Sequence, residues 1–118
     1  MLFLSRDEIL QHKAMRVEAV AVPEWSGTVN VKELTGRERD AFEAALVGKK
    51  KGEQINLDNF RARFVAAVVV DDKGQALFYP TDVELLGEMS AAALERVFSV
   101  GRRLSGMSDQ DVEELTKN

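Results

Sequence analysis

Residues 57–70 read Leu-Asp-Asn-Phe-Arg-Ala-Arg-Phe-Val-Ala-Ala-Val-Val-Val and contain the longest apolar run of the chain. Apolar side chains recur in it at steps of three, four, one and three, at Leu57, Phe60, Phe64, Val65 and Val68. This spacing makes one broad apolar stripe and predicts the central core helix. The triplet 68–70 is also compatible with a buried strand, because β-branched residues favour strands. Asp71-Asp72-Lys73-Gly74 ends the element in either case.

A β-hairpin is predicted on the N-terminal side of this stretch, from about Met15 to Lys32. Residues 15–22 are rich in β-branched and small side chains, and residues 28–32 alternate polar with apolar, as a half-buried strand does. Pro23-Glu24-Trp25-Ser26-Gly27 lies between them. Proline cannot continue a strand ladder and glycine permits positive φ, so this segment is the expected loop.

Three capping boxes, each a Ser or Thr with a Glu three residues later, predict helix starts. They are Ser5 with Glu8, Thr35 with Glu38, and Thr81 with Glu84. The first helix is expected to run to about Ala14, the second from about Gly36 to Val47, and the third is closed by Gly87.

Two more helices are predicted near the C-terminus. Ser90 begins one, on which Leu94, Val97, Phe98 and Gly101 share a face, and Gly106 ends it. A final acidic helix is expected from Ser108 through Leu115. The fold class is therefore α+β, an N-terminal hairpin packed on four to five helices, and residues 1–118 are expected to form a single domain.

Composition narrows the class of protein. The net charge is −4, whereas a nucleic-acid binder would usually present a basic surface, so no nucleic-acid partner is expected. Cysteine is absent, which excludes disulfides and thiolate metal sites and fits the cytoplasm. The apolar stretch within the first eight residues is too short for an export signal. The longest apolar run of the chain has seven residues, whereas a membrane span needs about 20.

No residue set predicts an active site, a metal site or a cofactor. His12 is the only histidine, and without partners a surface role is favoured over a general base or metal ligand. The acidic residues from Asp109 to Glu114 lack the glycine and spacing of a calcium loop. Gly48-Lys49-Lys50-Lys51-Gly52 lacks the pattern of a phosphate-binding loop and is interpreted as an exposed, mobile basic loop.

Apolar residues beyond those that a single core needs are the remaining candidates for function, because they could bind another protein. Trp25 in the hairpin loop either pins the loop onto the core, which is favoured, or anchors a partner. Leu2, Phe3 and Leu4 at the N-terminus and Phe78 with Tyr79 in the extended segment 75–79 are the other candidates. Each of them could instead be buried.

The order of segments carries a family resemblance. The chain begins with a short capped helix, followed by a Val-rich strand with a tryptophan-glycine turn. Then come Val31-Lys32-Glu33-Leu34-Thr35-Gly36-Arg37-Glu38-Arg39-Asp40, the core helix, Asp-Asp-Lys-Gly and a Leu-Ser-Gly-Met-Ser acidic tail. From about Val20 to Leu115 the chain resembles the tail assembly chaperones of long, non-contractile-tailed bacteriophages and prophages.

The resemblance implies a non-enzymatic protein that coats the tape measure protein, keeps it soluble and helps recruit tail tube subunits. It implies that the protein acts in the cytoplasm of the bacterial host and is absent from the mature virion. It also implies a longer form, made by a −1 ribosomal frameshift, whose extension binds the tail tube protein. Thr116-Lys117-Asn118 can be encoded as ACA AAA AAC, which permits such a slip. A chaperone for a long client is expected to be a homo-oligomer.

Two rival functions remain open. Short helices joined at residues 102–108 can look like the helix-turn-helix of a small DNA-binding regulator, although the acidic helix after that turn argues against it. Another structural phage tail or head protein, or a small enzyme subunit, is the second alternative.

Overall fold

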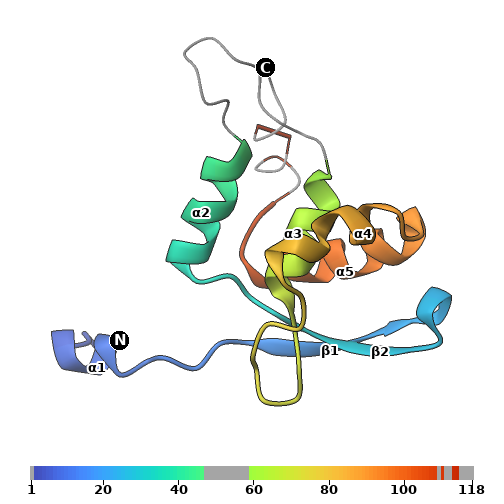
Figure 1. Cartoon of the computed structure of the whole chain (residues 1–118). Helices are drawn as coiled ribbons and strands as arrows, with labels where there is room; N and C mark the ends of the chain where they lie inside the picture. The colour runs from blue at the N-terminus through green and yellow to red at the C-terminus, as the bar shows by residue number, and fades with distance from the viewer. Residues whose placement is uncertain (1, 47–58, 109, 111–112, 115–118) are drawn as a thin grey trace, which may run out of the picture.

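The computed structural model describes residues 2–46, 59–108, 110 and 113–114, and the predicted α+β class is confirmed. A three-stranded antiparallel sheet in the order β1-β2-β3 carries helices on one face (Figure 1). The described elements are α1 (Arg6–Leu10), β1 (Val17–Val22), η1 (Pro23–Trp25), β2 (Gly27–Lys32), α2 (Gly36–Leu46), α3 (Phe60–Val68), β3 (Val69–Val70), η2 (Pro80–Asp82), α4 (Val83–Gly87) and α5 (Ala91–Leu104).

The predicted hairpin is confirmed as β1 and β2, which pair in continuous register from Val17 opposite Lys32 to Val22 opposite Gly27. Its loop is a 3₁₀ turn that begins at Pro23. The positive φ expected at a glycine falls instead on Ser26, with φ of 55°. Gly27 is already the first residue of β2, where it pairs with Val22 of β1. Ser26 is therefore the last residue of the turn that reverses the chain.

The ambiguous triplet 68–70 divides between a helix and a strand. Val68 ends α3, and Val69 and Val70 form β3, which pairs with Val31 and Asn30 of β2. The next turn is held by Asp71, whose Oδ1 accepts the backbone N–H groups of residues 73 and 75 at 2.8 and 3.0 Å. All three residues of the triplet are buried. Since an apolar run can be buried in either a helix or a strand, its apolar character alone does not show where α3 ends and β3 begins.

Two predicted capping boxes form, at the starts of α1 and α2. Glu8 N–H donates to Ser5 Oγ at 3.2 Å and Ser5 N–H to Glu8 Oε1 at 3.1 Å. The corresponding bonds between Thr35 and Glu38 measure 3.1 and 2.9 Å. The first helix is shorter than predicted, since it ends at Leu10 rather than near residue 14. No residue of α1 is buried, so no packing extends it.

The third predicted capping box is wrong. Asp82 Oδ2 accepts the N–H of Tyr79 at 2.8 Å, which caps a 3₁₀ turn that begins two residues earlier, at Pro80. Pro80 suits the first position of a helical turn because it has no N–H to satisfy. Thr81 therefore lies inside the turn, and α4 follows directly and ends at Gly87 as predicted.

Helix α5 begins and ends as predicted. Ser90 Oγ accepts the N–H of Ala93, and Gly106 adopts φ of 72° after the last turn. Gly106 N–H donates to Arg103 O at 3.1 Å and Met107 N–H to Arg102 O at 2.9 Å, the bond pair of a Schellman motif. Leu104 and Met107 are buried, so this turn closes over the core.

The core lies between the sheet and the helices. Helix α5 packs on β1 and β2, and α3 packs in turn on α5, α4 and α2. Phe64 is fully buried, with its ring edge-on to those of Phe42 and Phe98 at centroid distances of 5.3 and 5.1 Å. The predicted face of α5, at residues 94, 97, 98 and 101, is buried against this cluster.

Two predictions lie wholly or mainly outside the described residues. They are the lysine loop at 48–54 and the final acidic helix. Of the latter, Ser108, Gln110, Glu113 and Glu114 are described and exposed, and the last three of them are helical.

Candidate protein-binding surface

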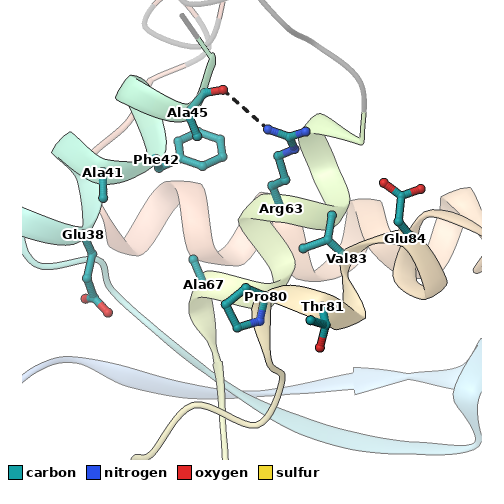
Figure 2. A pocket seen from close by; sticks show the side chains of 10 residues that line it. All are labelled: Glu38, Ala41, Phe42, Ala45, Arg63, Ala67, Pro80, Thr81, Val83 and Glu84. Atoms are coloured by element: carbon teal, nitrogen blue, oxygen red, sulfur yellow. Dashed lines mark hydrogen bonds between the residues drawn. The ribbon is translucent and has the colours of Figure 1, made fainter. Parts of the chain in front are cut away.

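An apolar groove runs between α2 and the segment 80–84, with α3 as its floor (Figure 2). Its volume is about 530 Å³, and a second hollow of about 340 Å³ continues it toward residues 76–79. Both hollows share Glu38, Arg63, Ala67, Pro80 and Val83, so they form one groove. We call it the α2–α4 groove.

Small side chains create the groove. Ala41 and Ala45 lie one helical turn apart on α2, so they share a face of that helix, and both are exposed. Ala67 of α3 lies on the floor, and Pro80 and Val83 form the opposite wall (Figure 2). Because alanine stops at Cβ, the backbones of α2 and α3 lie close to the open space. A helix from another protein could approach such a surface closely.

Charged groups stand at the ends and rim of the groove. Arg63 Nη1 donates to the carbonyl oxygen of Ala45 at 3.4 Å, which ties α3 to the last turn of α2. Glu38 bonds both Lys32 Nζ and the N–H of Thr35. Partial burial acts to raise the pKa of Glu38, but these bonds outweigh it and the pKa lies below its usual value. Glu38 is therefore ionised at neutral pH.

Phe78 and Tyr79, two of the predicted binding residues, both line the groove. Phe78 is half-buried and packs against the core, whereas Tyr79 is 73% exposed. The segment before Pro80, with Tyr79 in an extended conformation, borders the second hollow. The structure thus brings this predicted pair together with the alanine face of α2, which sequence reasoning did not identify.

Leu2, Phe3 and Leu4 lie elsewhere, in an N-terminal arm that comprises residues 2–16. They are 92%, 93% and 56% exposed. Figure 1 shows α1 standing away from the helices, beyond the start of β1. None of the three contributes to the groove.

Trp25 is half-buried and packs against the core. Its turn contacts α5, and Arg96 Nε of that helix bonds Glu24 Oε1 at 2.9 Å. The bond to Arg96 is the main cause that lowers the pKa of Glu24. These contacts favour the structural interpretation of Trp25, which pins the hairpin tip to α5.

The described residues show no constellation for metal binding. Within them, no group of three or more His, Cys, Asp or Glu side chains is placed to hold an ion. His12 is exposed at the end of α1. Among the helices that the structure describes, none has the length and apolar character to span a bilayer.

The fold and its surface define a small α+β protein, with a helix-covered hairpin sheet and an apolar groove. No family model matches the sequence, and neither does any curated protein. Among solved structures, the chain is similar to the tail assembly chaperone of bacteriophage HK97, with a TM-score of 0.61 and 21% sequence identity. The match covers 87% of this chain and 95% of that one. The predicted resemblance is thereby confirmed at the level of the fold.

Proposed function

We propose that this protein is a non-catalytic phage tail assembly chaperone that binds the tape measure protein and keeps it soluble. The observation that supports this most is the shared fold with the HK97 tail assembly chaperone over nearly the whole length of both chains. The sequence motifs point to the same family. The α2–α4 groove adds a surface suited to protein binding.

The groove is our proposed binding site for the client. Amphipathic helices commonly bind by laying an apolar face into a hydrophobic groove. Ala41, Ala45 and Ala67 allow close approach, while Tyr79 offers a large exposed face with a polar tip. A long helical client can fill such grooves on many copies of a small protein.

The rest of the proposal follows from the family resemblance. The chaperone helps recruit tail tube subunits, and a longer form made by a ribosomal frameshift carries the extension that binds tube protein. The protein works as a homo-oligomer in the cytoplasm of a phage-infected or prophage-carrying bacterium and is absent from the mature virion.

Co-expression with a tape measure protein from the same phage or prophage tests the main claim. We expect the tape measure protein to be soluble only with this chain and to co-purify with several copies of it. Apolar contacts should dominate, so the complex should survive about 0.5 M salt, which screens exposed ion pairs. A tape measure protein that is equally soluble alone would refute the proposal.

Substitutions in the groove test the site separately. Ala45→Glu places a charge in the groove, whereas Ala44→Glu, on the neighbouring exposed residue of α2, lies outside its lining. Both keep the helix, since glutamate is a good helix former. We expect only Ala45→Glu to abolish co-purification. Equal binding by both variants would place the client elsewhere and leave the chaperone function itself intact.

A further inference from the structure

Arg63 is a half-buried cation in the lining of the α2–α4 groove. Its Nη1 donates to the carbonyl oxygen of Ala45 at 3.4 Å, a long bond to a neutral acceptor (Figure 2). Most other described arginines pair with a carboxylate of this chain, namely Arg6, Arg16, Arg39, Arg61, Arg96 and Arg103. Among the residues that the structure describes, no carboxylate forms an ion pair with Arg63. The groove therefore presents a charge that lacks an anionic partner there.

Two carboxylates also line the groove, but neither satisfies Arg63. Glu38 is already bonded to Lys32 Nζ and to the N–H of Thr35. Glu84 is exposed, and water screens the charge of an exposed carboxylate. Figure 2 shows Glu38 and Glu84 on opposite walls, with Arg63 between them. Arg63 is thus the charge that an occupant of the groove has to accommodate.

We propose that the groove selects a helix whose apolar face carries an acidic side chain, and that this carboxylate pairs with Arg63. A helix seated between the apolar walls removes water from Arg63, and a charge that loses water without gaining a partner is costly. A carboxylate replaces the water with two parallel N–H···O bonds to the guanidinium. The inference rests on the proposed function, because it specifies which client helix this groove takes.

The spacing along α3 defines the sequence of the preferred helix. Arg63 and Ala67 are four residues apart, so they lie one turn apart on the same face of α3. A client helix that runs along α3 and places an acidic residue at Arg63 then has its next inward-facing residue at Ala67, three or four positions away. That residue meets an apolar floor and is expected to be apolar. The preferred segment is therefore an apolar stripe at helical spacing, interrupted by one Asp or Glu.

Three synthetic peptides test this preference on the full chain by isothermal titration calorimetry. Each has about 18 residues, a length that supports a helix, with leucine and alanine on one face and glutamine on the other. One position in the apolar face is Glu, Gln or Lys. Acetyl and amide caps remove the terminal charges, so this residue carries the only charge of the Glu and Lys peptides. We expect the Glu peptide to bind at least about tenfold more tightly than the Gln peptide, and the Lys peptide to bind most weakly.

Two arginine variants on α3 assign the preference to Arg63. Arg63→Gln removes the charge but keeps an N–H donor for Ala45 O, so the Glu and Gln peptides should bind it equally. Arg63→Lys keeps the charge without the fork of donors and should retain a smaller preference for Glu. Arg61→Gln is the matched control, because Arg61 is exposed, pairs with Glu95 and lies outside the groove lining. It should keep the full preference. Far-UV circular dichroism checks folding, and the wild-type comparison needs no variant.

Several outcomes would overturn the inference. They are equal binding of the three peptides by wild type, an unchanged preference in folded Arg63→Gln, and no binding of any peptide up to about 1 mM. The proposed function is tested separately, by co-expression with the tape measure protein. Co-purification of that protein without a peptide preference would leave the chaperone function in place and remove only the role of Arg63. A clear peptide preference with a tape measure protein that is soluble alone would do the reverse.

Discussion

Phe64 should be the most sensitive single position in the core. Replacing it with alanine removes a ring that is fully buried and edge-on to Phe42 and Phe98. The lost burial and the remaining cavity cost about 3–5 kcal/mol, and the loss of two favourable edge-on ring contacts places the cost in the upper part of that range. We therefore expect a loss near the upper end, about 4–5 kcal/mol, because helices on several sides prevent the site from collapsing.

Urea unfolding followed by circular dichroism measures this loss. Phe3→Ala is the matched control, since the same ring is removed from a side chain that is 93% exposed; it should change the free energy of unfolding by less than about 0.5 kcal/mol. Phe64→Leu, which nearly conserves volume, should cost about 1–2 kcal/mol and remains measurable if the alanine variant is largely unfolded. A loss below about 1 kcal/mol for Phe64→Ala would show that this ring does not fill the core.

Three further predictions test other parts of the structure. Gly101→Ala should destabilise by about 1–2 kcal/mol in urea despite alanine's helix propensity, because its Cβ would lie 2.8 Å from Phe64 Cε1; unchanged stability contradicts this. Glu38→Gln should cost less than about 1 kcal/mol at pH 7, since the pair with Lys32 is partly exposed. The folded-state pKa of Glu38 is lowered from 4.5, so its contribution is present above that pH and lost as pH falls through the folded pKa. Unfolding curves of variant and wild type whose separation does not shrink as the pH falls below 4.5 would refute this assignment. Trp25→Ala should destabilise by about 1–3 kcal/mol, as a half-buried packing residue does, and leave co-purification of the tape measure protein unchanged; stable folding with lost binding would instead assign Trp25 to the client surface.

Features governed by local chemistry were predictable from the sequence. The boxes at Ser5 and Thr35 formed because cap and glutamate are only three residues apart and no nearby carboxylate competed for the cap. The glycine stop at Gly106 likewise depends on its own backbone freedom. The hairpin and the buried stripe of α5 followed from apolar periodicity, which already encodes which face lies inside.

Where a local pattern had a close competitor, the prediction failed. Asp82 and Glu84 both offer a carboxylate for a cap, and Asp82 capped an earlier turn because Pro80 favours a helical start there. Ser26, rather than the neighbouring glycine, adopts positive φ because strand register determines where the chain reverses. The first helix ended early because none of its residues is buried.

By itself, the sequence determined the α+β class, the hairpin, and the apolar faces that α3 and α5 turn to the core, because each depends on periodicity and spacing along the chain. Only the tertiary structure decided which small residues remain exposed and what they meet. Ala41 and Ala45 become a groove wall because α2 packs at a distance from Pro80 and Val83, far away in sequence. Alanine is common both in protein interiors and on protein surfaces, so no local pattern distinguishes an alanine that lines a groove from one that packs in the core. The space between packed elements is a property of their arrangement and not of any one segment.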